Sequence, residues 1–235
     1  MKNRILFLDL ETTANKGWTW GKFEQNVIKF DEEYSLLCFA YKWSDGSKTK
    51  TIGLNDFKTN QQINLVIELR KLLDEAELVC GHNLDRFDLR MANTFILKAG
   101  LTPPSPYKTI DTLKIARNKF RFNSNRLNDL GEYLGIGCKK ETGGFQLWLD
   151  CIAGDKKAWV KMKKYNSNDV DLLEKVYLKL RPWATNINVN ISKGLLCPTC
   201  GSAELQKRGH STTIKGIFQR LQCTDCGHWT QEKIC

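Results

Sequence analysis

The chain has 235 residues, of which 41% are hydrophobic and 10% aromatic, so a sizeable core is expected and intrinsic disorder is not. Its formal net charge of +10 favours a polyanionic partner, most commonly nucleic acid, over a surface whose lysines serve only solubility. Because no apolar run suits a secretory signal or a membrane span, no membrane partner is expected. The predicted location is the cytoplasm, or the host cytoplasm if the chain is virus-encoded.

The N-terminal part of the chain predicts strands. Residues 4–10 form an apolar run typical of a buried strand, and residues 14–33 are expected to be a polar loop. Residues 34–54 hold two β-rich runs around Asp45-Gly46, a dipeptide that favours a hairpin turn.

Strands and helices are expected to alternate beyond this hairpin. Apolar spacing predicts a helix over residues 61–75, and a short strand over 77–83 precedes a helix over 86–99. A fifth strand is expected over 107–113. This order predicts an α/β fold with a mixed sheet.

The rest of the chain is expected to be helical up to a second module. Ser124 is predicted to cap a helix that runs to about Leu134, and residues 145–183 have helical spacing. Residues 184–194 carry few charges and no helical period, so they are expected to be a linker.

Acidic residues stand out at three places. Asp9 and Glu11 end the first strand on one face, where their mutual repulsion favours a divalent cation, although a solvated strand end is the alternative. Asp88 lies in the first turn of a helix, where it alternatively serves the helix dipole. Tyr165 and Asp169 share one face of a helix, and Asp169 is alternatively an exposed charge.

Together these places resemble the three motifs of the DEDD exonuclease family, which belongs to the ribonuclease-H-like superfamily. The motifs are Asp9-x-Glu11, Asn83-x₃-Phe87-Asp88 and Tyr165-x₃-Asp169. The tyrosine marks the DEDDy branch, similar to the proofreading domains of family B DNA polymerases. The resemblance covers residues 1–183 and implies a ribonuclease-H-like, five-stranded mixed sheet flanked by helices.

The resemblance also implies roles for individual residues. Two Mg²⁺ or Mn²⁺ ions are expected, and Tyr165 is expected to orient or deprotonate the attacking water. The expected ligands of the two ions are Asp9, Glu11, Asp88 and Asp169. Asp85 is interpreted as structural because the motif places its acid directly after the aromatic residue, and Asp111 is left out because its family equivalent is not usually a ligand.

Several residues are expected to bind the substrate. Trp18 and Trp20 follow the first motif, and the stretch 117–126 interleaves cations with Phe120 and Phe122, as suits single strands, although core phenylalanines are an equal alternative. The substrate-binding residues are predicted to be Thr12, Asn83, Phe87, Trp18, Trp20, Arg117 and Arg121.

Four cysteines predict a second metal site. Two Cys-x₂-Cys-Gly turns, CPTCG at 197–201 and CTDCG at 223–227, have the spacing of a structural Zn²⁺ site in a zinc ribbon, and residues 211–223 supply strand residues between them. The expected ligands of one Zn²⁺ are Cys197, Cys200, Cys223 and Cys226. Two disulfides are the alternative, disfavoured in the cytoplasm.

We therefore predict a 3′→5′ exonuclease domain over residues 1–185 and a β zinc ribbon over 190–235. Its substrate is expected to be DNA, at single-stranded or frayed 3′ ends, with trimming of RNA 3′ ends or a non-catalytic nucleic-acid-binding adaptor as alternatives. No polymerase domain is expected, so any proofreading role is expected to require a polymerase or a repair or recombination partner in trans. The sequence does not indicate an oligomeric state.

Overall fold

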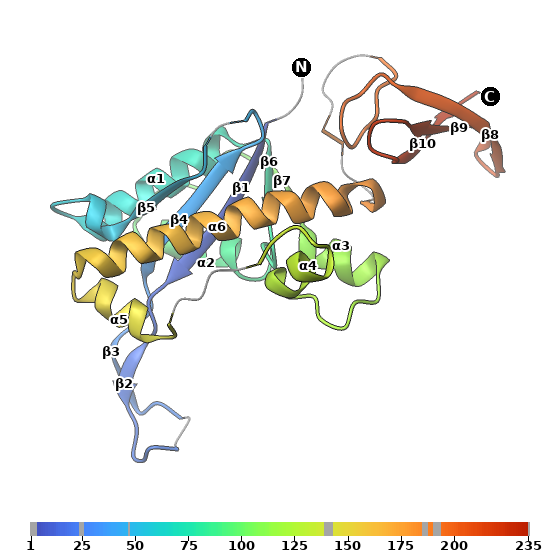
Figure 1. Ribbon diagram of the computed structural model, residues 1–235. Coiled ribbons are helices and arrows are strands. Elements are labelled where there is room, and N and C mark those ends of the chain that lie inside the picture. The colour runs from blue at the N-terminus through green and yellow to red at the C-terminus, as the bar shows by residue number, and fades with distance from the viewer. Residues whose placement is uncertain are drawn as a thin grey trace.

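A five-stranded sheet forms the centre of the larger domain. The computed structural model describes residues 4–23, 26–46, 48–138, 143–184, 188–189 and 194–234. In the order β5-β4-β1-β6-β7, β1 pairs parallel with β6 and β6 with β7, whereas β4 pairs antiparallel with both β1 and β5 (Figure 1). These strands are β1 (Ile5–Thr12), β4 (Leu36–Trp43), β5 (Lys50–Gly53), β6 (Leu78–Gly81) and β7 (Lys108–Asp111). The predicted mixed sheet is confirmed.

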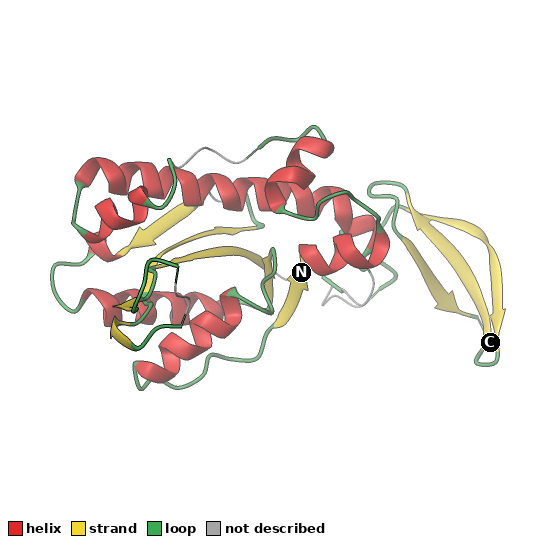
Figure 2. Ribbon diagram, turned by 90° about the horizontal axis from the view of Figure 1, so that it is seen from below, coloured by secondary structure: helices red, strands yellow, loops and turns green. Residues whose placement is uncertain are grey.

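Helices cover both faces of this sheet (Figure 2). They are α1 (Gln61–Glu75), α2 (Asp88–Lys98), α3 (Thr112–Lys119), α4 (Leu127–Tyr133), α5 (Gln146–Ile152) and α6 (Lys156–Leu180), with short 3₁₀ turns η1 (Leu54–Asp56) and η2 (Arg181–Trp183). Alternate residues of β1 point to opposite layers: Leu6 and Leu8 pack with α1 and α2, whereas Phe7 packs with α3, α4 and α6.

Two local predictions are wrong. Ser124 does not cap α4: Arg126 occupies the cap position, and the Ser124 hydroxyl instead accepts a hydrogen bond from the Arg126 N–H at 3.4 Å. Residues 14–33 are not only a loop, because β2 (Lys16–Trp18) and β3 (Lys29–Glu32) pair antiparallel into an arm that projects from the sheet (Figure 1). Both strands of the arm are exposed along their whole length, so no alternation of burial marks them in the sequence.

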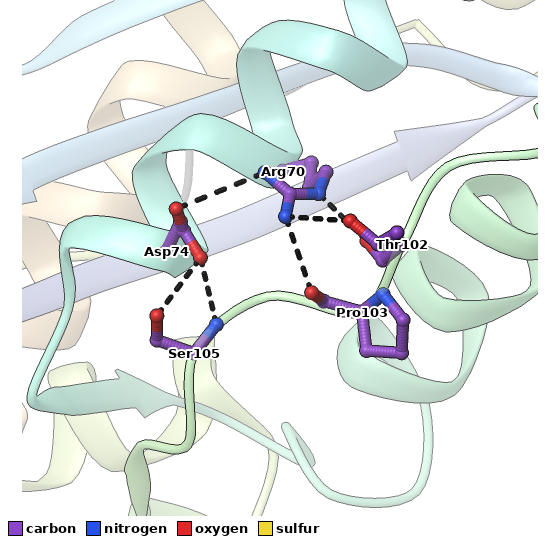
Figure 3. Close-up of polar contacts among 5 residues, drawn as sticks. All are labelled: Arg70, Asp74, Thr102, Pro103 and Ser105. Atoms are coloured by element: carbon purple, nitrogen blue, oxygen red, sulfur yellow. Dashed lines mark hydrogen bonds and ion pairs between the residues drawn. The ribbon is translucent and has the colours of Figure 1, made fainter.

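Polar contacts fasten the loop before β7 to α1 (Figure 3). Arg70 donates hydrogen bonds from Nε to the Thr102 carbonyl at 2.6 Å and from Nη2 to the Pro103 carbonyl at 3.2 Å. One turn later, Asp74 Oδ1 accepts hydrogen bonds from the Ser105 N–H at 2.7 Å and the Ser105 hydroxyl at 3.0 Å. These contacts hold the connection from α2 that sets β7 beside β6.

A second, three-stranded antiparallel sheet follows α6. It has the order β10-β9-β8, built from β8 (Leu205–Thr213), β9 (Gly216–Cys223) and β10 (Trp229–Lys233). Of the linker predicted at 184–194, residues 185–187 and 190–193 lie outside the described residues. Among the residues that are described, no helix combines the length and apolarity needed to cross a membrane.

Candidate active site and cysteine centre

Three carboxylates meet where β1 ends against α6. Asp9 and Glu11 continue the alternation of Ile5 and Phe7, so they face the α6 layer. Asp169, fully buried in the middle of α6, meets them from above the sheet. One ligand oxygen from each of the three acids lies within 4.8 Å of the others. Such a set of hard oxygen donors fits Mg²⁺ or Mn²⁺.

Asp88 lies near this cluster but belongs to α2, which packs on the opposite face of the sheet from α6. It is the first residue of α2, is only 3% exposed, and accepts a hydrogen bond on Oδ1 from the Leu10 N–H at 3.1 Å. Burial raises the pKa of Asp88 well above its ordinary value, and the charge of Asp9 raises it further, although the Leu10 N–H acts in the opposite direction. Asp88 thus lies near enough to Asp9 for the two charges to repel, without belonging to the group of three.

Asn166 is a residue of the site that the sequence analysis missed. Its side chain is fully buried, and its Nδ2 donates a hydrogen bond to Asp9 Oδ2 at 2.6 Å. The Cys38 thiol donates to Asn166 Oδ1 at 3.7 Å. Burial raises the pKa of Cys38 well above its ordinary value, and Glu11 and Asp9 raise it further, so this thiol stays protonated as a donor.

Tyr165 lies one helical turn before Asp169 on α6, as predicted from the spacing. It is half-buried, packs against the cluster formed by α5, α6 and β4, and meets Trp148 edge to face with 6.1 Å between ring centroids. The ring is therefore held by neighbours.

Asp85, interpreted as structural, and Asp111, left out of the ligand set, both have structural partners. Asp85 pairs with Lys114 at 2.5 Å. Asp111 caps α3 by accepting hydrogen bonds from the N–H groups of Leu113 and Lys114, and it also accepts one from the Asn83 N–H at 3.0 Å. Asp111 thereby fixes the turn after β6, where Asn83 adopts a left-handed conformation with φ of 68°.

The residues predicted to bind substrate fall in three places. Thr12 ends β1 directly after Glu11, and the 39% exposed Phe87 directly precedes Asp88. Asn83 lies in the turn before α2, where its carbonyl accepts a hydrogen bond from the Phe87 N–H at 3.0 Å. Trp18 and Trp20 lie on the arm with 63% and 87% of their surface exposed. Arg117 and Arg121 are exposed near the end of α3, whereas Phe120 and Phe122 pack partly into the core.

The four predicted zinc ligands converge in the second sheet module. One sulfur from each of Cys197, Cys200, Cys223 and Cys226 lies within 4.8 Å of the others. The Sγ atoms of Cys197 and Cys226 are 3.6 Å apart, as are those of Cys200 and Cys223. Tetrahedral Zn²⁺ with bonds of ~2.3 Å requires sulfurs ~3.8 Å apart, so the donor set fits zinc.

Both cysteine turns have the same backbone form. The N–H of Gly201 donates to the Cys197 carbonyl at 2.8 Å, and the N–H of Gly227 donates to the Cys223 carbonyl at 2.9 Å. The two glycines have φ of 78° and 79°, a left-handed conformation that other residues adopt at a cost. The repeated turn and the small sheet are compatible with a zinc ribbon.

This mixed sheet between helical layers, with acids clustered at the end of its central strand, is an RNase H-like fold. Residues 6–181 match the model of a family described as the RNase H superfamily. The chain therefore belongs to the RNase H superfamily.

Two known proteins are similar to parts of the chain. Protein NEN3 of Arabidopsis thaliana is 37% identical over 59 residues, which are 24% of this chain and 12% of that protein. The family B DNA polymerase of the hyperthermophilic archaeon Pyrobaculum calidifontis has a TM-score of 0.56 and 16% identity, covering 77% of this chain and 25% of the polymerase chain. At this identity the second likeness shows the fold alone, and the chain spans a quarter or less of either relative.

Proposed function

We propose that the protein is a metal-dependent 3′→5′ exonuclease that hydrolyses phosphodiester bonds of DNA. The observation that carries this proposal is the convergence of Asp9, Glu11 and Asp169 within 4.8 Å, with the buried Asp88 bonded to the Leu10 N–H directly after Asp9. A nuclease is the activity that such a cluster supports best on an RNase H fold. The resemblance of the three acidic motifs to those of polymerase proofreading domains favours DNA over RNA.

The carboxylates and Tyr165 have different roles in the proposed hydrolysis. When two divalent ions are bound, they acidify water and stabilise the leaving 3′-oxygen. Asp9, Glu11 and Asp169 would hold the ions at the end of β1, and Asp88 would complete the set from α2. Tyr165, one turn before Asp169, orients the attacking water through its hydroxyl, whose ordinary pKa near ~10 makes it a poor base.

The domain assignment is part of the proposal. Residues 1–185 form the nuclease domain, and residues 190–235 form a zinc ribbon that holds one structural Zn²⁺ on its four cysteines. A closed set of four thiolates has no open position for substrate, so the ribbon serves folding and nucleic-acid binding rather than chemistry.

A directional degradation assay tests the activity. A strand labelled at its 5′ end should shorten step by step with Mg²⁺ or Mn²⁺, whereas a 3′ label should be released at once as a mononucleotide. Running single-stranded DNA, frayed duplex DNA and RNA in parallel tests the substrate. Release of internal fragments, or loss from the 5′ end, contradicts the proposal, and faster digestion of RNA contradicts the assignment to DNA.

A further inference from the structure

The sheet of the ribbon module has two unlike faces. Register and alternation place Arg220 on one face with its neighbours Trp229 and Gln231, and the Arg220 guanidinium lies 4.9 Å from the centroid of the Trp229 ring. Lys233 shares this face, while the acid of β10, Glu232, points to the other. We call this side the ribbon face. It combines cations and an exposed aromatic ring with no acid from the three strands.

A second aromatic surface lies at the end of the nuclease domain. Four rings, from Tyr133 through Phe122 and Phe120 to Trp183, follow one another with centroid separations of 5.3, 5.1 and 5.3 Å. The outer two, Tyr133 and Trp183, are 74% and 53% exposed, whereas the inner two pack partly into the core. We call these four residues the ring ladder.

Cations accompany the ring ladder. The stretch 117–126 contains no acid, and its cations are all exposed. They are Arg117, Lys119, Arg121 and Arg126. Four exposed cations therefore lie in the stretch that supplies Phe120 and Phe122, whereas α4, which supplies Tyr133, carries Asp129 and Glu132.

The two surfaces meet at one contact. His228 donates a hydrogen bond from Nδ1 to the Pro182 carbonyl at 2.8 Å. Trp229 directly follows His228, and Trp183 directly follows Pro182, so the ribbon face and the ring ladder begin on either side of this bond. Figures 1 and 2 both show α3, α4 and the second sheet at the same end of α6, opposite to α5 and the arm.

We propose that the ring ladder and the ribbon face together bind the single-stranded part of a polynucleotide upstream of its 3′ end. Aromatic rings stack on bases of any sequence, and lysine and arginine bind the phosphates between them. That the bound strand is also the substrate rests on the proposed exonuclease function. Binding by this surface does not involve the carboxylates.

The position of the surface predicts a minimum strand length. Asp169 and Trp183 are separated by 14 residues of α6 and η2, or ~21 Å at ~1.5 Å per residue. A stacked strand advances ~3.4 Å per nucleotide, so ~6 nucleotides are needed to reach both sites. Shorter strands reach the active site without the surface.

Strand binding by the full-length, zinc-loaded protein tests the proposal, with Mg²⁺ and Mn²⁺ omitted to prevent cleavage. The probes are fluorescent oligothymidylates of about 15 and about 4 nucleotides, an oligouridylate, and an abasic strand of the longer length. Trp183→Ala and Trp229→Ala should each weaken binding of the long strands about tenfold. The abasic strand should bind these variants as it binds the wild type, and the short strand, which spans only part of the combined surface, should lose less affinity than the long strands.

Further variants separate stacking from charge and from folding. Trp229→Phe keeps a ring and should retain most of the affinity, whereas Arg121→Ala should weaken binding of the base-bearing and abasic strands alike. Leu97→Ala, which removes an 80% exposed side chain on the opposite helical layer, should change nothing. Zinc content and thermal unfolding report whether each variant is folded.

Two outcomes overturn the proposal. One is wild-type affinity for the long strand in folded Trp183→Ala and Trp229→Ala proteins, and the other is an equal loss for the abasic strand, which excludes stacking. Failure of the exonuclease function is distinguishable, because it appears as undegraded strands in the presence of Mg²⁺ while strand binding still depends on the two tryptophans.

Discussion

The side-chain amide of Asn166 donates a hydrogen bond to the carboxylate of Asp9, with 2.6 Å between Nδ2 and Oδ2. The Asn166 amide is itself oriented by the Cys38 thiol, and Asn166 and Cys38 are both fully buried. Asp9 is thus held by a hydrogen bond from the same helix that carries Asp169.

Replacing Asn166 should therefore weaken metal binding without unfolding the protein. Partners that orient metal-binding side chains are worth about 10- to 100-fold in affinity, so Asn166→Ala should lower Mn²⁺ affinity by that amount. Isothermal titration calorimetry measures this directly. Asn168→Ala is the matched control, because Asn168 lies two residues further along α6 and bonds to the Cys138 carbonyl instead. Unchanged Mn²⁺ affinity in Asn166→Ala contradicts the positioning role.

Loss of a carboxylate should have a far larger effect. Asp9→Ala or Asp169→Ala removes a ligand of the proposed ions and should lower turnover by orders of magnitude while far-UV circular dichroism stays unchanged. Asp85→Ala is the comparison, since it removes an acid that pairs with Lys114 and should be mild. A folded Asp9→Ala protein with near-normal turnover refutes the assignment, and a severe Asp85→Ala defect shows that the wrong acid was chosen.

Tyr165→Phe should separate water orientation from metal binding. Removing the hydroxyl costs one positioned group, worth roughly 10²-fold in the cleavage rate, while Mn²⁺ affinity should remain that of the wild type. Single-turnover cleavage of an oligonucleotide across pH measures the rate. If Tyr165→Phe matches the wild type at every pH, the tyrosine is only a packing residue between Trp148 and the core.

The cysteine centre should contain one zinc ion. Elemental analysis of protein purified without chelator should find one Zn²⁺ per chain, and Cys200→Ser should lose it because a closed site needs all four thiolates. Cys138→Ser is the control, since Cys138 is exposed and lies outside the cluster. Wild-type protein without zinc shows that the cluster has another role.

The contribution of the Asp74–Ser105 contact, which joins α1 to the loop before β7, to protein stability should depend on pH in the acid range. Hydrogen bonds from the Ser105 N–H and hydroxyl, with a contribution from Arg70, lower the pKa of Asp74 below its ordinary value. A lowered pKa in the folded state stabilises the protein above the unfolded-state pKa of ~3.9, and this stabilisation is lost as pH falls through the folded-state pKa. Urea unfolding of wild type and Asp74→Asn should therefore converge as pH falls below ~3.9. A stability difference that grows with acidity contradicts this sign.

Much of the fold could be predicted because buried and exposed residues recur along its helices and strands with the period of each element. The helix expected at 61–75 has those bounds in the structure, and the five strands lie along the chain where apolar runs and turn residues predict them. The arm could not be predicted, since β2 and β3 pair only with each other and bury nothing. The cap predicted at Ser124 is wrong because α4 begins at Leu127, whose burial in the core fixes the start of the helix.

The acids of the site could be predicted from the sequence, but the residue that orients Asp9 could not. Two carboxylates at the end of an apolar strand are visible in the sequence, because acids seldom follow such a run without a partner. Asn166 was missed although a signal exists: it lies four residues after Met162 and four before Val170, both buried. A polar residue within the apolar stripe of a helix requires a buried partner, and here that partner comes from β1.

α6 is one continuous helix of 25 residues, so its length sets how the nuclease domain and the ribbon module are oriented relative to each other. Tyr165, Asn166 and Asp169 lie on it, and η2, which receives the His228 contact, directly follows it. One residue inserted or deleted between these points rotates everything beyond it by ~100° and shifts it by ~1.5 Å. Homologues should therefore differ in this interval by whole helical turns or not at all, whereas loops elsewhere are free to change by single residues.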